Sequence, residues 1–354
     1  MDRFQIVETA GNFNHAGTKA TKDIAIVAEQ LGFKAVNVRM NSVRKTKIAK
    51  VWRQIGYFKD WNRSYREITE GSIVLMQHPF HYPQLTRERI LRRLRDKKHV
   101  KFICTVHDVE KLRAFRYNDY YGHEFDVMLE LADAIIVHNQ VMLDYFKELG
   151  VPEKKLINLE IFDYLQEEPG DALPVFAREI SVAGNLDTVK CKYIKQLGSI
   201  AGVGVNLYGP NFDETMRENE NVVYHGSFPA SEIPKKLVSG FGLVWDGDSI
   251  DGCKGLSGQY LRYNNPHKLS LYLSSGIPVI IWNGAAESSF VRDNHVGISV
   301  DSLSELSEIL ADMTEEEYTG YATAVKAVRE RLINGYYARR ALTKALEIVD
   351  GQGR

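Results

Sequence analysis

The chain has 354 residues, of which 44% are hydrophobic and 26% are charged, and its formal net charge is −1. This composition is that of an ordinary globular protein, and the length allows two domains with separate cores. The charge is unevenly spread, because residues 1–150 hold 25 Lys and Arg against 18 Asp and Glu, whereas the remainder holds 20 against 28. The basic first half predicts an anionic partner, such as a membrane surface or a phosphorylated acceptor, although solvated helix faces explain it equally well.

The cysteines and the N-terminal residues indicate the compartment. Cys104, Cys191 and Cys253 have no metal-site spacing, and one of them stays unpaired in any disulfide scheme. The opening residues MDRFQIVETAGNF lack the apolar core of a signal peptide, and no apolar run approaches the ~18 residues that span a bilayer. We therefore expect a cytoplasmic protein, located at the inner face of the plasma membrane if it contacts lipid.

Short apolar runs alternate with helical patterns along the chain. The predicted elements of the first half are a strand at 4–8, a helix near 18–31, strands at 35–40 and 73–77, a helix at 87–98, strands at 100–106 and 134–138, and a helix at 140–150. Residues 160–177 break this rhythm with Pro169, Gly170 and Pro174. The alternation then restarts with strands at 178–184, 203–209, 221–226, 241–245 and 277–282, and an amphipathic helix follows at 338–349.

This alternation is typical of parallel sheets wrapped by helices. We predict an α/β fold with two doubly wound, Rossmann-like halves: an N-terminal domain at 1–162, a linker at 163–177 and a C-terminal domain at 178–335. The halves leave a cleft between them. Ligands of such sheets bind at the carboxyl ends of the strands, where the chain turns into helices.

The segment NNPHKLSLYLSSGIPVI, residues 264–280, predicts a helix with Asn265 as N-cap and Pro266 at its first position. Lys268 falls in the first turn, where the partial positive charge of the backbone favours Asp or Glu. A cation at this place indicates that an anion binds there, and a diphosphate would satisfy Lys268 together with Asn264 and Asn265. A solvent-exposed lysine is the alternative.

Two strand-to-helix turns carry glycines that let the backbone approach a ligand. In VETAGNFNHAGTKATKDI, residues 7–24, Gly17 and Thr18 would present N–H groups, but this is not a Walker A motif, and taken alone it is better explained as a plain glycine turn. In ISVAGNLDTVKCKYI, Gly184 and Asn185 occupy a first strand-to-helix turn, which commonly approaches phosphate in nucleotide-binding domains.

Two further strand ends carry candidate ligand contacts. The strand in VNLYGP ends at Tyr208, which would contact a base or ribose, or else lie half-buried in the strand. In VWDGDSIDG, Asp246 and Asp248 match the Asp-x-Asp that holds Mn²⁺ or Mg²⁺ in many metal-dependent sugar transferases. That motif usually lies early, within a single nucleotide-binding domain. We therefore favour a solvated loop, or one that contacts sugar hydroxyls, over a metal site.

The segment FICTVHDVEKLR places His107 and Asp108 at the carboxyl end of a strand, and His78 and His81 end the neighbouring strand. A carboxylate there can act as general base on an acceptor hydroxyl, and the adjacent histidine can bind a pyrophosphate or the donor sugar. Helix capping by Asp108 and a loop hydrogen bond by His107 are the alternatives.

The segment RERILRRLRDKKHVK, residues 87–101, carries eight cations and no aromatic residue. The lack of interleaved aromatics argues against nucleic-acid binding. We interpret it as a solvated helix face that rests on anionic lipid.

Several of these segments together resemble a known family. NHAGTKATKDI, HDVEKLR, VAGNLD, WDGDSIDG and YLRYNNPHKLSLYLSSGIPVIIW are similar to segments of the bacterial GT-B β-1,6-galactofuranosyltransferases, relatives of the glucosyltransferases that extend GlcNAc on serine-rich adhesins. The resemblance covers nearly the whole chain. It implies a donor nucleotide held mainly by the second domain, an acceptor presented by the first, and a C-terminal helix, 336–354, that crosses back to the first domain.

The resemblance also implies roles for individual residues. Thr18 would face the donor phosphates from the first domain, and four residues would line the UDP site: Gly184, Asn185, Tyr208 and Lys268. The broader GT-B group often binds ribose through a Glu at the position that Leu271 occupies here. Ribose recognition would therefore fall to Tyr208 or to the 226–234 loop.

We therefore expect a metal-independent, inverting glycosyltransferase that needs no cofactor and acts in the synthesis of cell-surface glycans. It would move galactofuranose, as the first choice, from a UDP-sugar to a lipid-linked or protein-linked glycan. Lys268 would stabilise the leaving UDP, and Asp108 would deprotonate the acceptor.

Three alternatives stay open. They are a UDP-glucose-dependent transferase acting on GlcNAc of a glycoprotein, a nucleotide-sugar epimerase of the same fold, and a non-catalytic GT-B-like partner subunit. Membrane contact through the basic half and assembly into a homo-oligomer also stay open. No nucleic-acid partner is expected.

Overall fold

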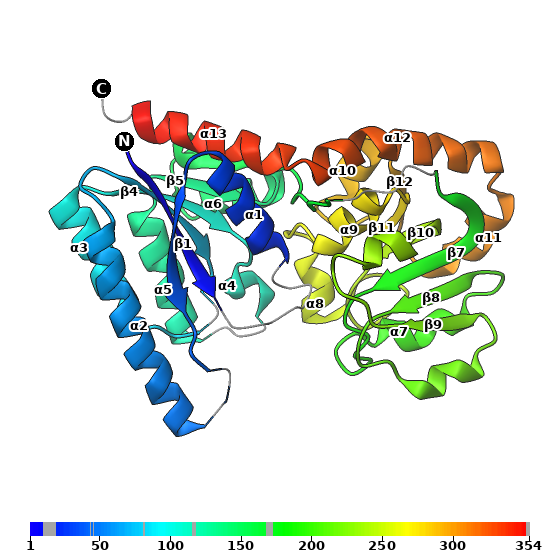
Figure 1. Cartoon of the computed structure of the whole chain (residues 1–354). Coiled ribbons are helices and arrows are strands. Elements are labelled where there is room, and N and C mark those ends of the chain that lie inside the picture. The colour runs from blue at the N-terminus through cyan, green and yellow to red at the C-terminus, as the bar shows by residue number, and fades with distance from the viewer. Residues whose placement is uncertain are drawn as a thin grey trace.

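The computed structural model describes residues 1–9, 19–42, 44, 46–80, 82–114, 118–167 and 173–351. The described strands form two six-stranded sheets, in the orders β2-β1-β3-β4-β5-β6 and β12-β11-β10-β7-β8-β9. Every strand pair in both sheets is parallel. Helices flank each sheet, so the predicted α/β fold with two Rossmann-like halves is confirmed (Figure 1).

The elements of the first half are β1 (Arg3–Thr9), α1 (Lys19–Gln30), β2 (Lys34–Arg39), α2 (Lys47–Glu67), β3 (Ile73–His78), α3 (Arg87–Lys98), β4 (Lys101–Val106), α4 (Glu110–Arg113), α5 (Asp119–Leu131), β5 (Ala134–Val137), α6 (Gln140–Glu148), the 3-10 helix η2 (Glu153–Lys155) and β6 (Leu156–Asn158). Those of the second half are β7 (Val175–Ala183), α7 (Tyr193–Gln196), η3 (Leu197–Ser199), β8 (Gly204–Tyr208), η4 (Glu214–Glu218), β9 (Val222–Gly226), η5 (Ile233–Lys236), β10 (Ser239–Val244), α8 (Gly255–Tyr260), α9 (His267–Ser275), β11 (Val279–Trp282), α10 (Ser288–Asp293), β12 (Gly297–Val300), η6 (Leu303–Glu305), α11 (Leu306–Asp312) and α12 (Glu315–Ile333), with α13 (Tyr336–Gly351) last.

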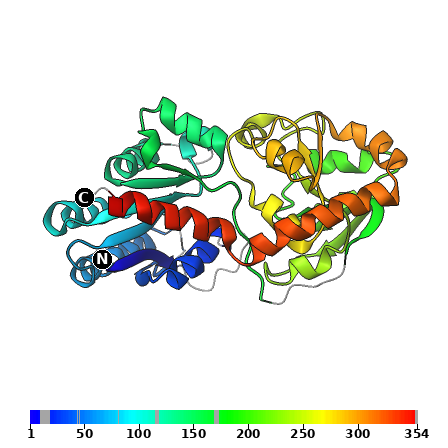
Figure 2. The ribbon, with the colours of Figure 1, turned by 90° about the horizontal axis from the view of Figure 1, so that it is seen from above.

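The first sheet is covered on both faces, and its strands have apolar side chains on both sides. In β3, Ile73 and Leu75 belong to the core that also contains residues of α1 and α13, whereas Val74 and Met76 pack among residues of α2 and α3. Successive side chains of a strand point to opposite faces, so a strand buried on both faces reads as a continuous apolar run. In Figures 1 and 2, α2, α3 and α5 cover one face of this sheet, and α1 and α13 cover the other.

The last helix joins the two halves. After α12, which lies against the second half, α13 runs back over the first sheet (Figure 2), as the resemblance implied. The Asp163 carboxylate accepts the N–H groups of Tyr337 and Ala338 at 3.2 and 2.6 Å, at the start of α13. At the other end, Lys101 of β4 donates to the Val349 carbonyl at 2.8 Å. The start of α13 is therefore bound to Asp163, directly after the first half, and its end is bound to β4 of the first half.

The structure differs from the sequence-based prediction in several elements, and strands β6 and β12 and helix α12 were not expected. The 21-residue helix α2 was not predicted, and it begins after Thr46, whose hydroxyl accepts the Ala49 N–H. Strand β7 begins at Val175, inside the predicted linker. Helix α9 begins at His267 without a side-chain cap, so the predicted N-cap role of Asn265 is wrong. Among the residues that the structure describes, no helix is long and apolar enough to cross a membrane.

Candidate functional site: a cation at the start of helix α9

The first turn of α9 lies against the carboxyl end of β7. Tyr272, one turn further along α9, accepts the Ala183 N–H with its hydroxyl at 2.9 Å, and its ring packs on Gly242, where a Cβ would come within 2.1 Å of the ring. Lys268 lies one turn before Tyr272 on the same helix face. Its Cε would lie 3.5 Å from a Cβ built on Gly184, so the side chain extends over the β7 turn. The structure thus brings Lys268 and Gly184 together, as the resemblance implied.

The Lys268 ammonium has a carboxylate close by. It donates to the Trp245 carbonyl at 3.4 Å, directly after β10. Burial lowers the pKa of Lys268, but the Asp246 carboxylate offsets this effect, and the resulting pKa lies above the ordinary lysine value. Asp246 Oδ1 accepts the Gly247 N–H at 2.7 Å and the Cys191 thiol at 3.3 Å. Asp246 therefore keeps Lys268 charged at neutral pH.

The ends of β7 and β8 approach each other through glycines. Gly209 has a φ of +143°, and a Cβ there would lie only 1.7 Å from the Gly184 carbonyl oxygen. The Gly184 N–H donates to the Tyr208 carbonyl at 2.9 Å. Side chains are excluded from this contact, so the turn after β7 leaves backbone accessible beside Lys268.

The other predicted nucleotide-site residues of the second half lie nearby with different surroundings. Asn185 is exposed, and its Oδ1 accepts the Asn211 amide at 2.8 Å. Tyr208 is buried and stacks on His225, with ring centroids 4.6 Å apart. The Tyr208 ring is thus already packed. Leu271, which stands where the broader group often has Glu, is also buried.

The two aspartates of the DGD loop diverge. Asp246 faces Lys268 and Cys191, whereas Asp248 pairs with Lys192 at 3.3 Å on the surface. Gly247 between them has a φ of +99°, which turns the chain sharply. The described residues contain no group of three His, Cys, Asp or Glu side chains arranged to hold a metal.

Asn265 lies in the contact between the two halves. Its N–H donates to His138 Nδ1 at 2.9 Å, and its side-chain amide donates to the Glu160 carbonyl at 3.2 Å. Its neighbour Asn264 is half-buried and donates its N–H to the Tyr260 carbonyl at 3.1 Å. Asn265 therefore contributes to the junction of the domains, and its bonds come from the first half. Of the remaining predicted residues, Gly17, Thr18 and His81 lie outside the described part of the chain.

The strand ends of the first half hold His107 and Asp108. His107 stacks on Phe162, with centroids 5.2 Å apart, and its Nε2 lies 2.7 Å from Gln77 Oε1. Asp108 pairs with Arg113 at 2.5 Å. The Tyr260 hydroxyl of the second half accepts the Val109 N–H at 3.0 Å. Burial and the nearby Asp108 carboxylate hold the pKa of the Tyr260 hydroxyl well above its ordinary value. Helices α4 and α8 are in contact, and Asp108 lies beside this contact between the two halves.

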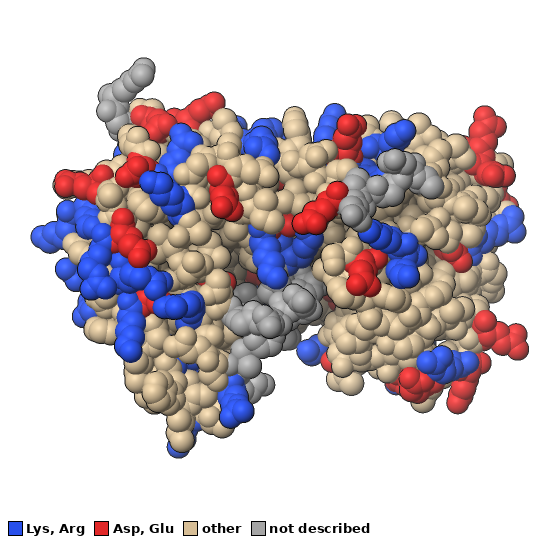
Figure 3. Space-filling model, in the orientation of Figure 1, with Lys and Arg blue, Asp and Glu red and all other residues tan. Residues whose placement is uncertain are grey.

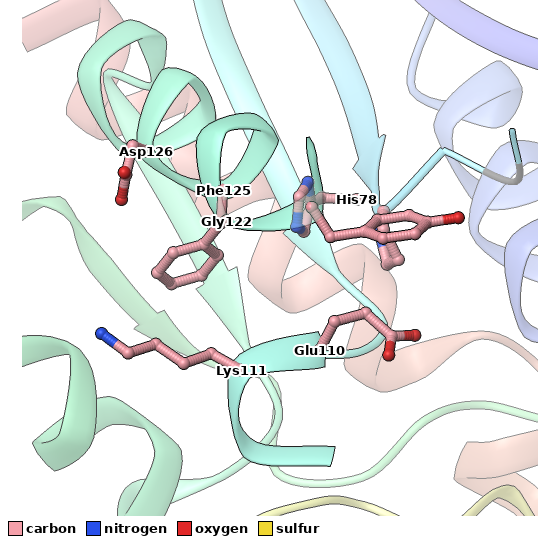
Figure 4. Close-up of a pocket in the computed structure, with 8 residues that line it drawn as sticks. His78, Glu110, Lys111, Gly122, Phe125 and Asp126 are labelled. Atoms are coloured by element: carbon pink, nitrogen blue, oxygen red, sulfur yellow. The ribbon is translucent and has the colours of Figure 1, made fainter. Parts of the chain in front are cut away.

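His78 lines a small hollow of about 70 Å³ in the first half (Figure 4). This volume is below the ~300–1,000 Å³ of small-molecule sites, so the hollow can take only part of a ligand. The hollow lies between α4 and α5, and it is lined by His78, Pro79, Glu110, Lys111, Tyr121, Gly122, Phe125 and Asp126. Burial and nearby Arg87 lower the pKa of His78 to about 3, so the imidazole is neutral.

The other hollow residues were not singled out from the sequence. In Figure 4 the Lys111 and Asp126 side chains lie on one side of the hollow and Glu110 on the other. Glu110 follows Asp108 by two residues in HDVEKLR, and this spacing was the one available signal. The lining combines charged groups with the Phe125 ring, which suits a small hydroxyl-bearing part of a ligand.

Two Rossmann-like parallel-sheet domains in one chain are the architecture of the GT-B class of glycosyltransferases. Solved structures have the same fold. HepE of Anabaena in complex with UDP and glucose has a TM-score of 0.62 at 10% identity and covers 98% of this chain and 100% of its own. The lipopolysaccharide outer core galactosyltransferase WaaB in its apo form has a TM-score of 0.56 at 11% identity, over 99% and 100%.

Sequence comparisons identify the family. Models of the N-terminal and C-terminal domains of glucosyltransferase 3-like proteins match residues 3–161 and 180–345. Beta-1,6-galactofuranosyltransferase WbbI of Escherichia coli (strain K12) is 35% identical over 251 residues, 70% of this chain and 72% of that one. Glucosyltransferase 3 of Streptococcus gordonii is 25% identical over 92% and 93%. The chain belongs to the glucosyltransferase 3-like family, and it is a glycosyltransferase.

Proposed function

We propose that this enzyme transfers a sugar from a UDP-sugar to a glycan acceptor, with inversion and without a metal ion. One observation carries the proposal: the Lys268 ammonium lies at the start of α9, beside the bare backbone of Gly184, and Asp246 favours its charged form. A helix N-terminus and a cation together form a site for a diphosphate. HepE, which has the same fold, was solved in complex with UDP and glucose, and this supports a UDP-sugar as the donor.

In the proposed mechanism, Lys268 and the first-turn N–H groups of α9 bind the diphosphate and stabilise the charge that develops on departing UDP. The acceptor hydroxyl gives its proton to Asp108, and its oxygen bonds to the anomeric carbon from the face opposite UDP. The bond from that carbon to the UDP oxygen breaks, and UDP keeps the electron pair. Arg113, paired with Asp108, orients the carboxylate. The hollow lined by His78 and Glu110 holds part of the acceptor glycan.

We propose galactofuranose as the donor sugar, because WbbI is 35% identical to this chain. Glucose is the alternative, because the glucosyltransferase 3 of Streptococcus gordonii aligns over 92% of the chain. A few side chains determine which donor sugar binds. The contacts of the DGD loop and of the hollow favour neither galactofuranose nor glucose.

The test uses the purified full chain and follows thermal unfolding with UDP, UDP-galactofuranose, UDP-galactopyranose and UDP-glucose. A bound ligand at ~100 times its Kd adds about 2.7 kcal/mol to the free energy of unfolding, so the donor gives a clear rise in melting temperature. Lack of stabilisation by UDP and by every UDP-sugar would refute the proposal.

A transfer assay with the stabilising donor then separates the remaining alternatives. Activity that persists in EDTA supports the metal-independent mechanism, whereas loss in EDTA and recovery with Mn²⁺ would overturn it.

A further inference from the structure

Helix α2 exposes apolar side chains on the face that points away from the protein. Its buried residues include Ala49, Arg53, Tyr57 and Asp60. At 3.6 residues per turn, the opposite face spans an arc of about 120°, and it holds the exposed side chains Ile48, Val51, Trp52, Ile55 and Phe58. Trp52 is 60% exposed and Phe58 is 52% exposed. A helix packed on a core normally turns polar residues outwards, so this face lacks the pattern of a solvated surface.

The loop after β3 extends the same apolar surface. Gln54 of α2 donates to the Pro83 carbonyl at 2.8 Å, and its Oε1 accepts the Leu85 N–H at 3.1 Å. This pair of bonds holds Leu85, which is 79% exposed, beside the helix. We call Ile48, Val51, Trp52, Ile55, Phe58 and Leu85 the α2 face.

The charged residues of the α2 segment 47–59 are all positive. Between residues 47 and 59 the chain has four cations and no carboxylate. Arg53 turns inwards to the Ser42 and Arg44 carbonyls, which leaves Lys47, Lys50 and Lys59 exposed. Figure 3 shows no Asp or Glu at the visible lower end of this helix.

The basic helix α3, which the sequence pointed to as the lipid contact, has a different environment. Arg92 binds both Glu88 and Glu130, Arg95 binds Asp133, and Lys98 binds the carbonyls of Tyr65 and Ile68. Carboxylates and carbonyls therefore already engage these three cations, although Arg89 and Lys97 of α3 are exposed. On α2, by contrast, the exposed lysines flank exposed apolar side chains.

We propose that the α2 face docks on an anionic phospholipid bilayer. Trp and Phe prefer the boundary between headgroups and acyl chains, and adjacent lysines are attracted by anionic headgroups. A second copy of the chain fits less well, because two α2 faces packed together would bring Lys47, Lys50 and Lys59 of both copies together without a carboxylate between them.

The position of the α2 face agrees with the proposed transfer to a glycan acceptor, and this agreement rests on the proposed function. Pro79 lines the hollow between α4 and α5, and the chain reaches the α2 face at Leu85. A glycan attached to a membrane lipid would therefore meet the first half of the enzyme close to the hollow.

The first measurement is intrinsic fluorescence with vesicles of phosphatidylcholine alone or with 30% phosphatidylglycerol. Trp52 is exposed, whereas the other three tryptophans, Trp61, Trp245 and Trp282, are buried. Docking shifts the emission to the blue with anionic vesicles, and Trp52→Phe abolishes the shift while binding persists in co-sedimentation. An unchanged shift in Trp52→Phe would show that the α2 face does not enter the bilayer.

The second measurement is the partition coefficient from co-sedimentation. The double variant Trp52→Ser, Phe58→Ser binds anionic vesicles at least about tenfold more weakly, because two rings no longer bury apolar surface. Lys47→Gln and Lys50→Gln each reduce binding about fivefold, and 0.5 M salt reduces it further. The matched control is Val223→Ser, Val238→Ser, which removes exposed apolar side chains of the second half and leaves binding unchanged.

Two results would overturn the proposal. One is wild-type vesicle binding by the Trp52→Ser, Phe58→Ser variant. The other is that the wild type forms an oligomer in sedimentation analysis, whereas the variant is monomeric and still binds vesicles as the wild type does. The α2 face would then be a contact between copies of the chain. The substituted side chains are exposed, so the variants retain the wild-type melting temperature.

Discussion

Replacement of Lys268 by Met tests the diphosphate site directly. The substitution keeps a long aliphatic side chain over Gly184 and removes the ammonium group. A charge-assisted hydrogen bond contributes about 1.5–3 kcal/mol, and because 1.4 kcal/mol corresponds to tenfold in affinity, we expect UDP to bind roughly 10- to 150-fold more weakly. The loss falls toward the upper end, since Asp246 keeps its negative charge next to the bound anion once the ammonium is gone.

Isothermal titration calorimetry with UDP measures this loss, and Lys326→Met is the matched control because Lys326 is exposed on α12. The double variant Lys268→Met, Asp246→Asn recovers part of the affinity, since the repelling carboxylate is removed as well. Since the pKa of Lys268 is raised, UDP affinity of the wild type does not fall between pH 7 and 9. A Lys268→Met variant that binds UDP within twofold of the wild type would refute the anion site at α9.

Three further predictions concern catalysis, backbone packing and pH. Asp108→Asn lowers kcat by ~10²–10⁴-fold and leaves UDP affinity unchanged. A decrease in kcat below tenfold would show that Asp108 is not the general base. Glu110→Gln, by contrast, raises the acceptor KM more than it lowers kcat. Gly209→Ala lowers the free energy of unfolding by more than ~2 kcal/mol, since its Cβ would lie 1.7 Å from a carbonyl oxygen. The control Gly320→Ala does not destabilise the protein, because its Cβ meets nothing within 4 Å. Equal melting temperatures for the two variants would contradict this argument. Burial raises the pKa of Glu287 from 4.5 to about 8, so its contribution to the free energy of unfolding is complete below pH 4.5 and is lost as pH rises to about 8. Urea unfolding between pH 5 and 9 then gives a free energy of unfolding that falls with pH, and Glu287→Gln makes this fall less steep. An equally steep fall in the variant disproves the assignment.

Local sequence patterns predicted the features that depend on neighbouring residues. The position of Lys268 in the first turn of α9 follows from Pro266 and the apolar run after it. The glycine turn at Gly184 follows a recognisable strand. Because the sheets are parallel, Gly184 and Lys268 were both expected at the carboxyl ends of strands. The structure places these two residues next to each other.

Features that depend on distant residues could not be predicted in this way. Asn265 was taken for a helix cap, but its partners His138 and Glu160 lie in the other half, more than a hundred residues away in the chain. Helix α2 escaped notice because apolar residues occur on its outer face as well as its inner one, which weakens the 3.6-residue period. The hollow beside His78 is assembled from three elements, and no single segment carries its pattern.

The return of α13 to the first sheet has a consequence for synthesis of the protein on the ribosome. Leu342, Ala345 and Val349 are buried, and α13 packs against β4, β5 and β6. The first domain therefore cannot finish its core when its own strands have emerged, because the covering helix is translated only after the second half. A newly made first domain would expose apolar strand surface while about half the chain is still being synthesised. The first half is consequently not expected to be stable as a separately expressed fragment that lacks α13.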